Sequence, residues 1–184
     1  MKVVILAGGK GTRLSEYTKT IPKPMVKIQK FPIIIYIMKH YAKYGFKDFI
    51  IATGYKKNVI EKYFKRKFFD WNIKLVNTGK ETMTGGRIKR LKKIIKNETF
   101  MLTYGDGLSD VNLKKLLLFH YKNKATVTLT AVRPPARFGA ISLKGNKVAV
   151  FREKSSLDSG WINGGFFVME PEIFKFIKND KTFL

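Results

Sequence analysis

The pattern of apolar positions divides most of the chain into alternating short strands and amphipathic helices. Runs rich in β-branched and aromatic residues are typical of strands, and they occur at 2–7, 49–53, 73–77, 100–104 and 126–132. Segments with apolar residues at helical spacing begin near residues 32, 57, 84 and 110. This alternation predicts βα units around a mostly parallel sheet.

Capping residues and helix breakers predict where the helices begin and end. Pro32 is expected to begin a helix that Gly45 ends. Thr84 is expected to cap a basic helix that runs through residues 86–96, and Asp110 to cap a helix that runs to about Tyr121.

The regular alternation of predicted strands and helices ends after residue 132. The Pro-rich segment "RPPARFG" (133–139) precedes two apolar runs that flank "KGN", which predicts a hairpin. A further strand at 162–169 and a short helix from Pro171 follow. We therefore expect one α/β domain with a Rossmann-like, doubly wound first part and a more antiparallel tail that makes the sheet mixed.

Composition narrows the classes of function. The 184 residues contain no cysteine, which excludes disulfides and thiolate metal sites and favours a reducing, cytoplasmic location. No stretch reaches the roughly 18 apolar residues of a membrane helix, so no membrane partner is expected. The net charge is +24, from 37 Lys plus Arg against 13 Asp plus Glu, but the lysines are spread over nearly every predicted surface element, which favours a solvated basic surface over a nucleic-acid interface.

A glycine loop follows the first strand as "LAGGKGTRL" at 6–14. It matches neither the dinucleotide-binding pattern nor the GxxxxGK[ST] loop. Closely spaced glycines still let backbone N–H groups approach an anion, and Arg13 offers a planar fork for phosphate oxygens. Lys23, held between two prolines, is a second candidate for the same anion. A tight strand exit with no ligand is the alternative interpretation of the glycines.

Other candidate residues lie at the ends of later strands. Asp106 follows a strand within "TYGDG" and is a candidate ligand for Mg²⁺, although Asp-Gly is also common in plain turns. Glu153, Lys154 and Asn163 are candidates for sugar hydroxyls and a phosphate, or else ordinary surface residues. The sequence has no serine in a nucleophile elbow, so covalent catalysis has no strong candidate.

Taken together and in order, these motifs resemble the sugar-phosphate nucleotidyltransferases. The signature "LAGGxGTRL" followed by "PKPM" is present at 6–14 and 22–25. Four later motifs are similar to the glucose-1-phosphate cytidylyltransferase branch: "MTGGRIKR" at 83–90, "TYGDG" at 103–107, "RFGA" at 137–140 and "INGGFFV" at 162–168. The resemblance extends from Met1 to about Asp180.

The resemblance implies the nucleotide-diphospho-sugar transferase type of sheet, with a nucleotide-binding part at 1–132 and a sugar-phosphate-binding part at 133–184. It implies CTP and a sugar 1-phosphate as substrates, Mg²⁺ as cofactor, and CDP-glucose and pyrophosphate as products. The implied catalytic residues are Arg13, Lys23 and Asp106, with Asp106 on the metal. The implied nucleotide-binding residues are Leu6, Gly8, Gly9, Gly11, Thr12, Arg13, Lys23, Glu81, Gly85, Gly86, Arg87 and Gly105, and the implied sugar-phosphate ligands are Glu153, Lys154 and Asn163.

The chain departs from the family pattern in two places. The segment between the helix at 57–66 and the strand at 73–77 is short, so the family's subunit contacts are not implied and a homo-oligomer stays open. Family members continue past the position of Leu184, and we expect the further part to carry a second metal-binding aspartate. The alternatives are a weakly active or inactive remnant that binds nucleotide or sugar phosphate, an enzyme for another base or sugar, and a basic nucleic-acid-binding module.

Overall fold

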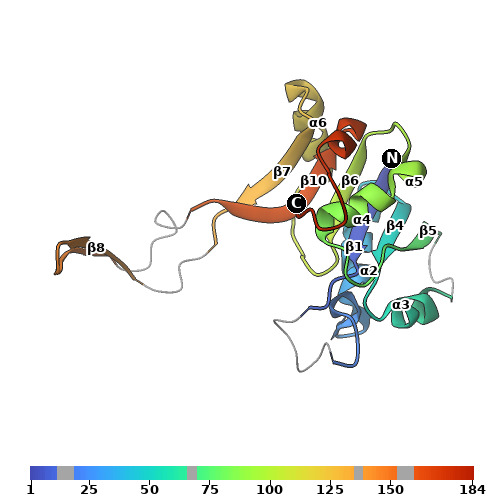
Figure 1. The fold of residues 1–184 in the computed structure, drawn as a ribbon, viewed down its shortest axis with the longest axis horizontal. Coiled ribbons are helices and arrows are strands. Elements are labelled where there is room, and N and C mark those ends of the chain that lie inside the picture. The colour runs from blue at the N-terminus through green and yellow to red at the C-terminus, as the bar shows by residue number, and fades with distance from the viewer. Residues whose placement is uncertain (12–18, 66–69, 135–138, 153–159) are drawn as a thin grey trace. The chain divides into compact units, whose positions relative to one another are not determined.

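The computed structural model describes residues 1–11, 19–65, 70–134, 139–152 and 160–184 (Figure 1). These residues form two compact units, the first comprising Met1–Thr128 with Gly165–Leu184 and the second Leu129–Gly164. The first unit contains β1 (Lys2–Ala7), η2 (Lys23–Met25), β2 (Lys27–Ile28), β3 (Phe31–Pro32), α2 (Ile33–Lys43), β4 (Asp48–Thr53), α3 (Lys57–Phe64), β5 (Asn72–Asn77), α4 (Thr84–Arg90), α5 (Lys92–Ile95), β6 (Phe100–Tyr104), α6 (Leu113–Asn123) and η4 (Pro171–Lys175). The strands β7 (Val127–Val132) and β10 (Ile162–Met169) run from one unit into the other, and β8 (Ala140–Lys144) and β9 (Lys147–Arg152) belong to the second.

A six-stranded mixed sheet in the order β5-β4-β1-β6-β10-β7 confirms the predicted fold class. The strand β1 pairs in parallel with β4 on one side and with β6 on the other, and β4 pairs in parallel with β5. Antiparallel pairing of β10 with β6 makes the sheet mixed. Since the chain moves from β1 first toward β4 and later back across to β6, the order reverses between β1 and β6, and ligands of open α/β sheets bind at such a switch point.

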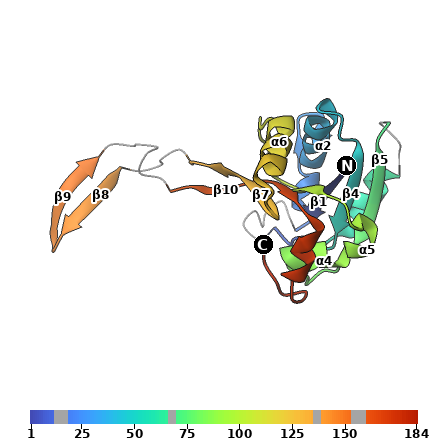
Figure 2. The same cartoon turned by 90° about the horizontal axis from the view of Figure 1, so that it is seen from above.

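Both faces of the central strands β1, β4 and β6 are buried, which explains why these strands are nearly continuous apolar runs. Alternate residues of β1 point to opposite faces: Val3 and Ile5 lie in one core cluster with residues of α2, α3 and α6. Val4 and Leu6 lie in the other with residues of α4, α5 and the segment around η4. Figure 2 shows α2 and α6 on one side of the sheet and α4 and α5 on the other.

Three predicted helix boundaries are wrong. Asn112, not Asp110, caps α6, because its side chain accepts a hydrogen bond from the Lys115 amide at 3.0 Å. Thr84 is the first residue of α4 rather than its cap. The single basic helix expected over 86–96 is two short helices, because the Leu91 amide donates to the Ile88 carbonyl at 2.9 Å in a tight turn between them.

The second unit contains the predicted hairpin. The strands β8 and β9 pair antiparallel around Gly145, which has a φ of 60°, a conformation that glycine adopts without strain. A register shift at Ser142 and Leu143 interrupts the ladder. In the described part of the chain, every helix is too short or too polar to cross a membrane.

His120 on α6 is 1% exposed, although the amphipathic pattern around it suggests a surface position. Its Nδ1 lies 2.8 Å from Thr128 Oγ1 on β7, and its Nε2 lies 2.9 Å from Glu170 Oε1 after β10. The Glu170 carboxylate also accepts a hydrogen bond from the Thr99 hydroxyl at 2.9 Å. The imidazole therefore links α6 to the neighbouring strands β7 and β10, because a buried polar group must find partners.

We predict that His120→Ala lowers the free energy of unfolding by about 3 kcal/mol, since it leaves a void and removes the partner of two polar groups. The matched control is Leu118→Ala on the same helix, where the side chain is 68% exposed and the change should stay within about 0.5 kcal/mol. Urea unfolding of both variants measures the difference. Equal losses in the two variants would contradict a structural role for the buried imidazole.

Candidate functional site

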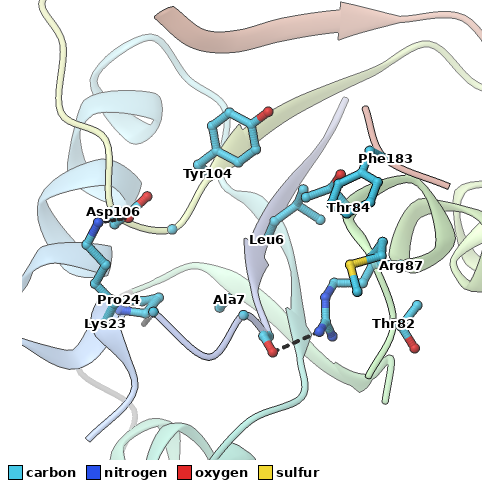
Figure 3. Close-up of a pocket in the computed structure, with 15 residues that line it drawn as sticks. Leu6, Ala7, Lys23, Pro24, Thr82, Thr84, Arg87, Tyr104, Asp106 and Phe183 are labelled. Atoms are coloured by element: carbon cyan, nitrogen blue, oxygen red, sulfur yellow. Dashed lines mark hydrogen bonds and ion pairs between the residues drawn. The ribbon is translucent and has the colours of Figure 1, made fainter. Parts of the chain in front are cut away.

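A cavity of about 400 Å³ opens at the carboxyl ends of β1 and β6 (Figure 3). Its walls come from the loop after β1, the loop after β6, η2, the segment before α4 and the segment after η4. The lining residues are Leu6, Ala7, Gly8, Gly9, Gly11, Lys23, Pro24, Thr82, Met83, Thr84, Arg87, Tyr104, Gly105, Asp106 and Phe183. This is the switch point of the sheet, so the fold itself determines where the cavity lies.

Lys23 and Asp106 form an ion pair on one side of this cavity (Figure 3). The Lys23 ammonium and the Asp106 carboxylate are each about one-third exposed, at 29% and 31%, so both remain within reach of a ligand. Gly105 directly precedes Asp106 and holds the end of β6 beside β1, because its amide donates to the Leu6 carbonyl at 3.0 Å. A Cβ at Gly105 would lie 2.7 Å from Pro24 Cγ, so only glycine allows β6 to end against the loop that carries Lys23.

Arg87 lies on the other side of the cavity and is 3% exposed. Its guanidinium donates to the Gly8 and Gly79 carbonyls at 2.8 and 2.7 Å and to the Thr78 hydroxyl at 2.8 Å. Burial lowers the pKa of Arg87 from its ordinary value, and the nearby charge of Arg90 adds a smaller effect in the same direction. An arginine keeps its charge even so, so the site has a desolvated cation at its base.

A second ion pair joins the loops near the cavity without lining it. The Lys10 ammonium lies 2.8 Å from the Glu81 carboxylate, and both side chains are exposed. The pKa of Glu81 lies below its usual range because it accepts this hydrogen bond. Exposed pairs of this kind contribute little stability, so the contact links the loop after β1 to the loop after β5 without fixing either.

Gly85 and Gly86 pack against the C-terminal segment instead of lining the cavity. The Gly85 amide donates to the Thr182 carbonyl at 2.9 Å, and the Met83 amide donates to the Asp180 carbonyl at 2.8 Å. A Cβ at Gly86 would lie 2.5 Å from the backbone of Asp180. The glycines of α4 therefore make room for another part of the protein, and this packing brings Phe183 into the cavity wall.

The structure brings together most of the predicted nucleotide-site residues that it describes. Leu6, Gly8, Gly9, Gly11, Lys23, Arg87, Gly105 and Asp106 line one cavity. Glu81, Gly85 and Gly86 lie beside it, and Asn163 is an exposed residue of β10 in the second unit. Thr12, Arg13, Glu153 and Lys154 lie outside the described residues.

Sequence reasoning missed several residues of the wall, among them Thr82, Met83, Tyr104 and Phe183. Tyr104 ends β6 directly before the "GDG" turn, so its position at the sheet edge could have been predicted from the strand pattern. Phe183 had no local signal, because the packing of the C-terminal segment on α4 brings it there.

The chemistry of the cavity favours an anion with several charges. The described wall contains two cationic side chains, Lys23 and Arg87, and the backbone of four glycines, whereas Asp106 supplies its one carboxylate. Within the described ranges, no three histidine, aspartate or glutamate side chains gather as a metal cluster. Asp106 is suited to a hard cation that takes its other ligands from water and phosphate, as Mg²⁺ does.

Comparisons of sequence with known proteins indicate one family for this chain. Residues 2–183 match the nucleotidyl transferase family. The chain is 45% identical to the glucose-1-phosphate cytidylyltransferase of Salmonella typhimurium, over 99% of this chain and 80% of the relative. It is 37% identical to the D-glycero-alpha-D-manno-heptose 1-phosphate guanylyltransferase of Campylobacter jejuni, over 95% of this chain and 78% of the relative. The crystal structure of HddC from Yersinia pseudotuberculosis complexed with GMP-PN superposes with a TM-score of 0.76 at 26% identity, covering 99% of this chain and 82% of that one.

We predict that Asp180→Asn increases amide hydrogen exchange at Met83 and Gly85. The Arg90 guanidinium donates to the Asp180 carboxylate at 3.0 Å and holds its pKa below the usual range. A lowered pKa means that the contact is present above the ordinary carboxyl pKa of about 3.9 and is lost only as the pH falls below it. Protection of the Gly85 amide in the unmodified chain should therefore stay constant from pH 7 to about pH 4.

The control for this measurement is Asp70→Asn. That substitution removes an exposed ion pair with Lys47, at 2.7 Å, on a different loop, and should leave the Met83 and Gly85 amides unchanged. Unaltered exchange at Gly85 in the Asp180 variant would show that the C-terminal segment stays on α4 without this contact.

Proposed function

Because the chain belongs to the nucleotidyl transferase family, we propose that it transfers the cytidylyl group of CTP to glucose 1-phosphate and releases pyrophosphate. The observation that carries this proposal is the single cavity shared by the glycine loop, Lys23 and Asp106. These groups are far apart in the sequence, yet they converge at the position where an open α/β sheet binds its ligand. The 45% identity to a glucose-1-phosphate cytidylyltransferase supports the choice of base and sugar.

In this proposal the triphosphate lies along the glycine loop, where Gly8, Gly9 and Gly11 let backbone N–H groups approach its oxygens. Lys23 neutralises the charge of the phosphates from the opposite wall. Arg13 and Thr12 belong to the same loop and are proposed to contact the triphosphate as well. Leu6 and the segment from Thr82 to Thr84 then lie where the wall is least charged, which suits the base and ribose.

We assign the sugar phosphate to the later part of the chain. Glu153 and Asn163 offer hydrogen-bonding groups to the hydroxyls of glucose, and Lys154 offers a cation to its phosphate. The 1-phosphate is already an anion, so its oxygen can attack the α-phosphorus of CTP without a general base. The new P–O bond forms as the bond to the β-phosphate oxygen breaks, and the electron pair leaves with pyrophosphate.

The protein's contribution to this step is alignment and neutralisation of charge. Two anions must approach each other, and fixed cations in a partly dry cavity reduce the electrostatic cost of that approach. Asp106 would hold Mg²⁺, and the fit is consistent with an accessible carboxylate next to a polyphosphate-sized cavity. When bound, the metal would supply further neutralisation of phosphate charge.

The central test is pyrophosphate release by the full chain with Mg²⁺, glucose 1-phosphate and each of CTP, GTP, UTP and dTTP. We expect CTP to be the best substrate and release to require the sugar phosphate. Faster release with GTP would replace the cytidylyl assignment with the activity named for the guanylyltransferase relative. CTP binding with no release under any condition would reject the enzyme in favour of a nucleotide-binding protein.

We further expect Lys23→Ala to reduce kcat/KM for CTP by about 10²-fold, since it removes a preorganised cation at the developing charge.

Asp106→Asn should raise the concentration of Mn²⁺ needed for half-maximal CTP-dependent binding, measured by the spin resonance of free Mn²⁺. Lys114→Ala, at an exposed position on α6, is the matched loss of one lysine and should change neither quantity by more than twofold. Equal effects of Lys23→Ala and Lys114→Ala would mean that only the overall positive charge matters.

A further inference from the structure

The guanidinium of Arg87 occupies a slot at the ends of three neighbouring parallel strands. Its acceptors include the Gly8 carbonyl after β1, the Thr53 carbonyl at the end of β4, at 3.4 Å, and the Gly79 carbonyl after β5. The three loops leave the sheet at the same edge. A single side chain of α4 therefore contacts the carboxyl ends of three neighbouring strands.

The slot exists because two of the surrounding residues have no side chain. A Cβ at Gly8 would lie 2.1 Å from Arg87 Nη1, and a Cβ at Gly54 would lie 2.5 Å from the same atom. Neither distance leaves room for a carbon atom. Gly8 lines the cavity, whereas Gly54 does not, so the slot extends from the cavity wall to the far side of the guanidinium.

The contact with Gly8 determines the orientation of one peptide group in the glycine loop. The Gly8 carbonyl accepts from Arg87 Nη2 at 2.8 Å and from the Tyr55 amide at 3.0 Å. In a planar trans peptide the C=O and the following N–H point in opposite directions. Fixing the Gly8 carbonyl toward Arg87 and Tyr55 therefore directs the Gly9 N–H away from both. A Cβ at Gly9 would have no described atom within 4 Å, so there is open space beside this residue.

Arginine is suited to this task and lysine is not. The planar fork reaches several carbonyls at once with fixed geometry, whereas an ammonium is a single point with no such fork. The carbonyl and hydroxyl acceptors are neutral, so a positive charge remains at the base of the loop. An effect of charge alone would survive replacement by lysine, but an effect of geometry would not.

We propose that Arg87 is a positioning residue for the triphosphate site, acting through the Gly8–Gly9 peptide rather than by touching the base or ribose. The inference rests on the proposed function only in taking the ligand to be a nucleoside triphosphate. It replaces the direct contact with cytosine and ribose that the family resemblance implies for this residue.

The first experiment measures binding of CTP and of inorganic tripolyphosphate to the full chain by calorimetry. Arg87→Lys should weaken both ligands by up to about 10²-fold, which is the scale of losing a hydrogen bond to a charged group. Arg90→Lys is the control, because Arg90 is a partly exposed arginine of the same helix, and we expect it to bind both ligands within twofold of the unmodified chain. Loss of CTP binding with tripolyphosphate binding retained would mean that Arg87 contacts the base or ribose, and would overturn the proposal.

A second variant perturbs the slot at a residue that does not line the cavity. Gly54→Ala places a Cβ against the guanidinium and against the carbonyls of Gly79 and Gly8, and should reproduce the loss of tripolyphosphate binding while circular dichroism shows a folded chain. Gly160→Ala, where no described atom lies within 4 Å of the new Cβ, is the control for glycine replacement. Full binding by a folded Gly54→Ala protein would overturn the proposal.

Chemical rescue separates positioning from general stability. Arg87→Ala leaves space for a free guanidinium ion, so millimolar guanidinium chloride should restore at least tenfold of the lost tripolyphosphate binding, and sodium chloride at equal ionic strength should not. Absence of rescue in a folded Arg87→Ala protein would refute the positioning role. If the unmodified chain binds tripolyphosphate but not CTP, the proposed function fails while the positioning role stands.

Discussion

The pairing of β1 with β4 on one side and β6 on the other is the constraint on which the site depends. The strand β1 is buried on both faces, with β4 beside it on one side and β6 on the other. The chain passes from β1 toward β4 and reaches β6 only after crossing back, so the strand order reverses between the loops that follow β1 and β6. The opening between them is a consequence of topology, and it would exist whatever residues lined it.

What makes this opening suitable for a polyphosphate is the uneven distribution of charge around it. Lys23 is paired with Asp106, so the pair is close to neutral until a ligand or a cation competes for one partner. Arg87 differs, because its acceptors are neutral and its guanidinium is buried. Among the described residues that line the cavity, the excess of positive charge therefore comes from one desolvated side chain. The net charge of +24 describes mainly the solvated surface and says little about this cavity.

The sequence predicts the sheet and the cavity well because both depend on patterns that are local in the chain. Apolar runs place β1, β4, β5 and β6, and residues that directly follow parallel strands meet at one edge, which is why Gly8 and Asp106 could be grouped in advance. Lys23 does not directly follow a strand, and its flanking prolines and the resemblance of "PKPM" to the family signature grouped it with them. Contacts between distant segments were not predictable. The pattern around His120 is that of an ordinary amphipathic helix, and only the arrival of Thr128 and Glu170 from elsewhere in the chain buries its ring. The end of α4 was missed for a related reason, since a tight turn at Leu91 leaves the spacing of apolar residues almost unchanged.

The glycines show most clearly where sequence reasoning stops. A glycine near a proposed ligand site invites the interpretation that it makes room for the ligand, and Gly9, with open space where a Cβ would be, is consistent with that interpretation. Gly85 and Gly86 instead make room for the C-terminal segment, and Gly54 makes room for the guanidinium of Arg87. The identical residue type thus leaves open space at one position and makes room for the protein's own packing at another. The sequence shows that a close approach occurs at these positions, but only the three-dimensional contacts show what approaches, and at Gly8 the loop and the buried arginine approach each other.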